Sequence, residues 1–405
     1  MSPKLSKVSI AVACTFLSVV ANAEDMRDLR DLKGAGGAGM VNVGGFEITP
    51  KLDLALGNNS NVGQQTVNQT SSSYVSLVPS VVVNLPSHGN SYGVKYNGSY
   101  SYYSASKQDD FGNHNFDAYA NNIWSDRFKS AVNLDYVLGH DARNTLMFAS
   151  KELWHTTGVK GAVDYGRDGA IGQFQLAAGQ LSKRYDTNVS GGTQTYNYDR
   201  NDLTGAFFYR VAPATQMILE AGNTNFNYVD AASKRLDSKE MRYLLGVKWE
   251  ATAKTTGYLK LGRQNKTFNL GLLPTGKGNV WSTVVAWAPK EYSKVNFSLS
   301  QGFNEYGGVG SFIVSRDAGV SWTHNWTGML TSVFTAGDGQ DKFQNATRVD
   351  KRQTYSANVS YPVFGWLRVG VGFQNVNRNS NFAGASYNQS SVMMTLNSAL
   401  SENVF

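Results

Sequence analysis

The clearest indication of the fold class lies in residues 92–102, which read YGVKYNGSYSY. Large apolar or aromatic side chains alternate here with small or polar ones: Tyr92, Val94, Tyr96, Tyr100 and Tyr102 against Gly93, Lys95, Asn97 and Ser99. Successive side chains of a β-strand point to opposite faces of the sheet, so the two kinds of residue lie on different faces. This pattern is typical of a transmembrane β-barrel strand, whose outer face meets lipid and whose inner face meets water.

The same alternation continues from Phe46 to the end of the chain. Apolar faces recur as Phe46, Ile48, Leu52, Leu54 and Leu56; Val75, Leu77, Val81 and Val83; Val132, Leu134, Tyr136 and Leu138; and Met241, Tyr243, Leu245, Val247 and Trp249. Pro50 and Pro79 fall inside two of the predicted strands. Proline has no N–H to give to a neighbouring strand, so we expect a β-bulge or a frayed strand end at each.

The connections between the predicted strands alternate in length. Eight short turns are expected at 86–90, 125–129, 168–169, 212–214, 251–254, 289–291, 325–327 and 362–365. Nine long polar loops separate them, including 58–71, 104–113, 143–157, 186–197, 229–238, 267–278 and 380–387. This count predicts an antiparallel up-and-down barrel of about 18 strands, with 16 possible. Short turns face the periplasm in outer-membrane barrels, and long loops face outside.

Composition supports an all-β membrane protein. The 405 residues include 41 Gly and are 17% charged and 12% aromatic, whereas soluble domains are roughly 25% charged. No run of about 18 apolar residues is present, which excludes a helical membrane protein. The main alternative is a soluble β-sandwich or propeller, but its outer face would be polar. The basic residues are scattered, so nucleic acid is not an expected partner.

The N-terminus has the features of a secretory signal peptide, residues 1–23. Lys4 and Lys7 precede an apolar segment, and Ala21-Asn22-Ala23 favours cleavage between Ala23 and Glu24. The single cysteine, Cys14, lies in this segment, so the mature chain has no disulfide. A lipoprotein cleavage box around Cys14 is the alternative.

Residues 24–45 are expected to form a periplasmic segment that ends in a flexible glycine-rich linker, and residues 46–405 the barrel. Gly34–Gly39 matches the letters of a dinucleotide-binding motif, but no strand precedes it and no helical pattern follows. We therefore expect no cofactor. The terminal Phe405 resembles the aromatic residue that the barrel assembly machinery recognises, which makes that machinery an expected partner.

The sequence offers little for catalysis or metal binding. The five histidines show no metal-ligand spacing, so no metal site is predicted. Only His140-Asp141 forms an adjacent acid–base pair, and no nucleophile motif accompanies it. A polar strand end at the outer rim is the simpler interpretation, and we expect no enzyme.

The residues between the apolar positions are predicted to line the lumen. The candidates are Lys95, Tyr119, Asp135, Arg210, Arg242, Lys248, Tyr258, Lys260, Arg368 and Arg378. Basic residues exceed acidic ones among them, and a barrel of this size leaves an aqueous lumen in which charge selects solutes. The alternative is that these groups only form pairs across strands.

Four short motifs resemble the putative β-barrel porin 2 family: Gly57–Val62, Leu77–Ser80, Asp117-Ala118-Tyr119 and His140–Arg143. Members of this family are outer-membrane barrels often encoded with exopolysaccharide or capsule biosynthesis genes. The resemblance implies export of a polysaccharide chain across the Gram-negative outer membrane, together with a periplasmic polysaccharide export protein. It implies no catalytic residues.

Three other functions are compatible with such a barrel. The first is a general or solute-specific diffusion porin, the second an outer-membrane hydrolase, and the third a purely structural barrel. No loop is obviously long enough to form an elaborate plug. In each case outer-membrane lipid is the partner of the outer face.

Overall fold

A computed structural model describes residues 40–145, 148–252 and 254–399. Its strands are β1 (Val41–Val43), β2 (Phe46–Asn59), β3 (Ser72–Ser87), β4 (Asn90–Tyr103), β5 (Phe111–Ile123), β6 (Phe128–Asp141), β7 (Glu152–Tyr165), β8 (Gly172–Tyr185), β9 (Tyr198–Ala212), β10 (Thr215–Tyr228), β11 (Ser238–Thr252), β12 (Thr255–Phe268), β13 (Gly276–Lys290), β14 (Ser293–Asn304), β15 (Ile313–Asn325), β16 (Thr331–Phe343), β17 (Val349–Phe364), β18 (Leu367–Ser380) and β19 (Tyr387–Ala399). Three 3₁₀ turns lie in loops: η1 (Lys107–Asp109), η2 (Thr193–Tyr196) and η3 (Ala231–Leu236).

Strands β2 to β19 form one closed barrel. Each strand pairs antiparallel with the next along the chain, and β19 returns to pair with β2 from Ser391↔Asn59 to Ala399↔Lys51. Over the described ranges this gives 18 barrel strands, which confirms the predicted fold class. A closed barrel leaves no unpaired sheet edge, so every strand can satisfy its backbone polar groups away from water.

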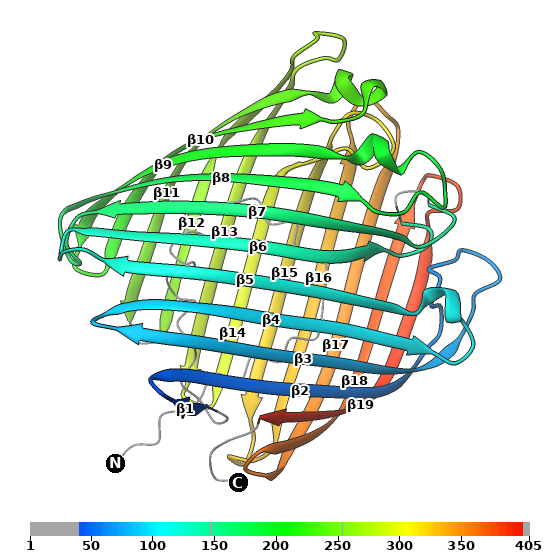
Figure 1. Cartoon of the computed structure of the whole chain (residues 1–405), viewed down its shortest axis with the longest axis horizontal. Coiled ribbons are helices and arrows are strands. Elements are labelled where there is room, and N and C mark those ends of the chain that lie inside the picture. Colours follow the sequence, from blue (N-terminus) through cyan, green and yellow to red (C-terminus); the bar gives the residue numbers. More distant parts are fainter. Residues whose placement is uncertain (1–39, 146–147, 253, 400–405) are drawn as a thin grey trace.

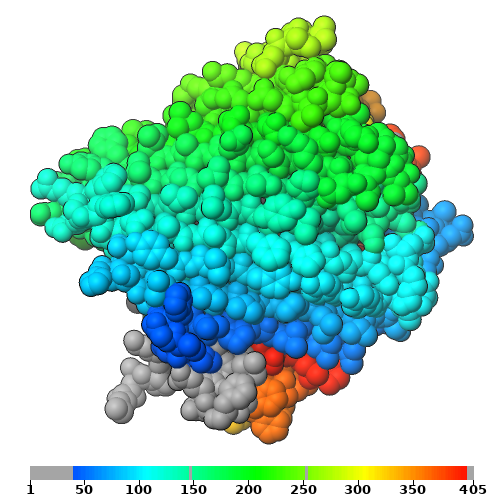
Figure 2. All heavy atoms as spheres, in the orientation of Figure 1, coloured from blue at the N-terminus to red at the C-terminus, as the bar shows by residue number. Residues whose placement is uncertain are grey.

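The two ends of the barrel differ, as the alternating connection lengths predicted. The long loops and the three 3₁₀ turns gather at one end, and the short turns lie at the other (Figure 1). Between the ends, the outer face of β2–β9 forms a continuous surface (Figure 2). The residues that could contact a solute are therefore those of the inner wall and of the loops at the long-loop end.

The outer face carries the apolar residues. Val94, Leu134, Leu203 and Leu245 are each more than half exposed, and they all belong to the apolar alternation. A soluble protein rarely exposes a continuous apolar surface of this size. The exposed belt is therefore the lipid-contacting surface of the barrel, and the soluble sandwich or propeller is excluded.

The bulges expected at the two prolines are absent. The β2–β3 register runs through Pro50↔Val81 and Leu52↔Pro79 without a shift. At Pro79 the β3–β4 pairing stops after Leu77↔Tyr100 and resumes at Ser80↔Asn97 in the same register. The missing proline N–H is thus accommodated by a short gap in the ladder, without an inserted residue.

The linker expected to reach residue 45 also needs a correction. Val41–Val43 pair with Phe46–Ile48 across Gly44 and Gly45, which both have positive φ (57° and 89°). Two such glycines suit the tight turn of a hairpin, so β1 forms a short hairpin with the beginning of β2.

Several predicted features lie outside the described residues: the signal peptide with Cys14, Ala23 and Glu24, the motif Gly34–Gly39, and Phe405. Across 40–145, 148–252 and 254–399, no helix is long and apolar enough to cross a membrane.

Candidate channel

Strand alternation places all ten candidate lumen residues on the inner face, opposite the apolar belt. The pairing register shows this directly on β4–β6, where Lys95 is opposite Asp117 and Asp117 is opposite Asp135. On β11 and β12, Lys248 is opposite Tyr258. The ten residues are spread around the wall and do not form one cluster.

One inner-wall cluster joins Glu220, Arg242 and Lys260 on β10, β11 and β12. The Lys260 ammonium lies 3.1 Å from one Glu220 oxygen, and the Arg242 guanidinium lies 3.0 Å from the other. Lys260 is fully buried. It therefore does not line an open lumen as expected, because a buried ammonium is stable only beside an opposite charge.

Tyr119 also differs from the expectation. Its ring is 5% exposed and covers Gly93, and its hydroxyl donates to Asn84 Oδ1 at 3.0 Å. A tyrosine covered in this way offers no free ring face for stacking on a sugar. Tyr258 keeps a partly exposed ring, with its hydroxyl 3.1 Å from Ser282 Oγ.

A second cluster, missed by the sequence analysis, lies closer to the loop end. Lys266 is fully buried and contacts Glu240 Oε1 at 2.8 Å and the carboxylate of Glu305. Tyr228 donates to the other Glu305 oxygen at 2.7 Å. Glu240 and Lys266 follow the inward alternation, but Glu305 belongs to the loop after β14, where no periodicity indicates its direction. The cluster fixes this loop to the wall.

A third cluster lies on β15–β17. Arg352 donates to Asp317 at 2.7 Å and approaches Asp341 at 2.8 Å. These three residues were not among the candidates either, although all follow the inward alternation. Charge on the inner wall is therefore largely organised in pairs, which keeps the wall polar without leaving buried charges uncompensated.

At the loop end, the loop 142–151 contacts segments from other parts of the barrel. Arg143 donates to both oxygens of Asp109 at 2.8 and 2.6 Å; Asp109 is buried and Arg143 is partly buried. Asn144 donates to the Gly63 carbonyl at 2.6 Å, and its own carbonyl accepts from Arg378 of β18 at 3.1 Å. We call Asp109, Arg143, Asn144 and Arg378 the mouth latch.

The mouth latch joins distant parts of the rim. Five strands, β19 and β2 to β5, separate β18 from β6, where the loop 142–151 begins. The loop must therefore cross part of the mouth to reach Arg378. The sequence analysis found no loop long enough to form a plug, and in the structure Arg143 and Asn144 of this short loop are held over part of the mouth by their contacts.

Aromatic contacts connect further loops. Tyr196 of η2 stacks on Tyr306 of the loop after β14, with ring centroids 5.4 Å apart, and Phe148 contacts Tyr196 at the same separation. Ser233 of η3 donates to the Thr195 carbonyl at 2.7 Å. Burial raises the pKa of Tyr196 to about 12, so its phenol stays neutral in this contact.

The pair His140-Asp141 does not form an acid–base site. As neighbours on β6, their side chains point to opposite faces of the wall. A ring nitrogen of His140 lies 2.8 Å from Asn113 Oδ1, whereas Asp141 accepts hydrogen bonds from Trp154 and Tyr185. The two residues therefore stabilise separate parts of the rim.

Comparison with known families agrees with this architecture. The model of the family described as putative β-barrel porin 2 matches residues 35–399. The chain belongs to this family. The porin is thus an outer-membrane β-barrel. Comparison with curated proteins gives no match.

Solved structures similar to the porin come from at least two organisms. OccK2 (OpdF) of Pseudomonas aeruginosa in complex with glucuronate has a TM-score of 0.50, with 11% identity over 87% of this chain and 98% of that one. OccK3 (OpdO) of the same organism gives 0.48, with 14% identity over 87% and 96%. The FrpB iron transporter of Neisseria meningitidis gives 0.47, with 12% identity over 89% and 66%. Identities this low describe the fold alone.

Proposed function

We propose that the protein is a diffusion porin for small polar solutes. The observation that carries the proposal is the mouth latch together with the aromatic loop contacts, which hold loops across the outer end of the barrel. A narrowed mouth with a polar, charged wall passes solutes of limited size and selects them by charge. An extended polymer would need these contacts to open.

Reconstitution into liposomes tests the proposal. Osmotic swelling should follow the uptake of small sugars and decrease steeply as the sugar becomes larger, and planar bilayers should show discrete channels. A barrel that gives neither swelling nor conductance would contradict a diffusion function.

The inner wall should also set ion selectivity. Replacing Lys95→Gln and Arg368→Gln removes two inward positive charges, so the reversal potential in a salt gradient should move toward cation preference. Lys351→Gln on the outer face is the control and should leave it unchanged. An unchanged potential in the inward double variant would mean that these residues lie outside the ion path.

Export of a polysaccharide, with a periplasmic export protein, is the second candidate. The inward cations, among them Lys95 and Arg368, favour it because they suit an acidic polymer. A deletion strain separates the two functions. Slowed nutrient uptake with normal surface polysaccharide supports diffusion, whereas loss of surface polysaccharide with normal uptake supports export and contradicts the main proposal.

A further inference from the structure

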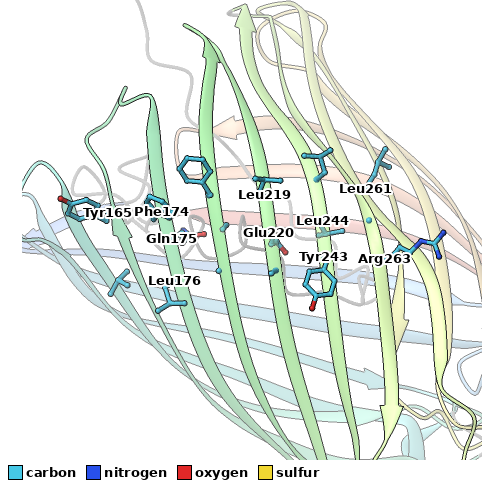
Figure 3. A pocket seen from close by; sticks show the side chains of 17 residues that line it. Tyr165, Phe174, Gln175, Leu176, Leu219, Glu220, Tyr243, Leu244, Leu261 and Arg263 are labelled. Atoms are coloured by element: carbon cyan, nitrogen blue, oxygen red, sulfur yellow. The ribbon is translucent and has the colours of Figure 1, made fainter.

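The outer wall carries an apolar groove at β7–β12. Its volume is about 940 Å³, and its rim includes Tyr165, Phe174, Leu176, Leu219, Tyr243 and Leu261. These side chains belong to the exposed apolar belt, so the groove opens toward lipid and not toward the lumen. Figure 3 shows Leu219 and Leu261 in one row across the strands and Leu176, Tyr243 and Arg263 in the next row.

Small residues make the floor of the groove. Leu176, Gly205, Ala221 and Tyr243 follow one another across β8–β11, so two minimal side chains separate two large ones. A Cβ added at Gly205 would have no atom within 4 Å. The groove is therefore open space that a larger side chain could fill without displacing the wall.

The loop-side rim of the groove is basic. On β12 the outward residues change from Leu259 and Leu261 to Arg263 and Asn265, so Arg263 marks the end of the apolar belt. Lys277 of β13 pairs with Asn265 and is thus the diagonal neighbour of Arg263, about 7–8 Å away between Cα atoms. Both side chains are exposed.

Neither cation has an acidic partner. Among the described residues, no ion pair or hydrogen bond involves the side chain of Arg263 or Lys277. A third outward cation, Arg316 of β15, lies 5.5 Å from the ring of Trp281, the β13 residue opposite Leu261. The outward carboxylate of Asp338 is the diagonal neighbour of Arg316 on β16, away from the groove. The basic character is therefore strongest at Arg263 and Lys277.

We propose that this site binds one phosphorylated lipid of the outer leaflet, a lipid A-type glycolipid. Its phosphate contacts Arg263 and Lys277, and one acyl chain lies in the groove over Gly205 and Ala221. Charge complementarity selects this occupant: a phosphate accepts charge-assisted hydrogen bonds from guanidinium and ammonium groups, and the loop end of an outer-membrane barrel faces the outer leaflet. A neutral lipid would leave both cations without partners.

Binding of purified diphosphorylated lipid A to the full-length protein in detergent, followed by native mass spectrometry, tests the proposal. The double substitution Arg263→Gln and Lys277→Gln should weaken binding roughly tenfold, because it removes two charged contacts. The matched control is Lys342→Gln with Lys351→Gln, another pair of outward diagonal neighbours away from the groove. It should leave the affinity unchanged.

Filling the groove tests the acyl chain separately. Gly205→Leu should weaken lipid A binding although both cations remain. Removing the phosphates of lipid A should weaken its binding to the unaltered protein at least as much as the double substitution of Arg263 and Lys277 does. Heat-modifiable migration verifies that each variant is folded. Equal losses in the basic variant and its control would overturn the proposal. So would a Gly205→Leu variant that keeps its lipid affinity but loses an oligomeric state, because the groove would then be a subunit interface.

Discussion

Breaking the mouth latch at Asp109 should open the outer end of the channel. Asp109→Asn keeps the size of the side chain but removes the charge that Arg143 contacts through two hydrogen bonds, with the two side chains only 7% and 13% exposed. Removing one partner of a buried pair costs about 3–5 kcal/mol. The amide of asparagine can still accept one hydrogen bond, so we expect the closed position of the loop to lose about 2 kcal/mol of stability.

That free energy changes the ratio of open to closed loop about 30-fold, because each 1.4 kcal/mol is roughly a factor of ten. Single-channel recording should therefore show a higher mean conductance or more frequent opening, and trypsin added outside should cut after Arg143 or Lys151 faster. Asp126→Asn is the control, since the same change there affects an exposed pair with Arg167 at the short-turn end. If Asp109→Asn conducts and resists trypsin like the unaltered protein, the latch does not hold the loop.

Three further outcomes follow from the wall and the loops. Lys260→Met removes one of the two ion pairs of Glu220 described above and should destabilise the barrel by a few kcal/mol. The heat-modification temperature of this variant should fall, and adding Glu220→Gln should partly restore it. An epitope tag in loop 186–197 should be detected on intact cells and one at Gly169 should not, and the reverse labelling would invert the barrel. Tyr196→Ala removes the stack on Tyr306 and should increase conductance without lowering the heat-modification temperature.

The barrel could be predicted from the sequence because the features that indicate it, strand alternation and connection length, are local. The strand number followed from counting the short turns and long loops along the whole chain. Alternation at period two, as from Tyr92 to Tyr102, fixes which side chains face lipid. The inward direction of Arg242 or Lys248 followed in the same way. The sequence also indicated that Pro79 would disturb the pairing of its strand. It did not indicate that the disturbance would be a short gap in pairing and not a bulge.

What the sequence could not give depends on contacts between distant segments. Nothing local indicates that Lys260 is covered, because the carboxylate that it contacts, Glu220, lies on another strand. The contact between Arg143 and Asp109 joins two loops, and loops have no periodicity from which a direction could be inferred. Loop length alone therefore did not indicate that Asn144 would reach Arg378 on the other side of five strands.

The hydrogen bond from Arg378 to Asn144 joins residues 234 positions apart in the chain. Arg378 lies on β18 and Asn144 follows β6, and the shorter path between them around the wall runs through the β19–β2 pairing, so the contact needs a barrel in which β19 has met β2. A barrel stalled before that step has fewer restraints on the loop 142–151, and is therefore leaky as well as incomplete. The contact that holds the loop and the pairing that closes the barrel therefore depend on the same event, the meeting of β19 with β2.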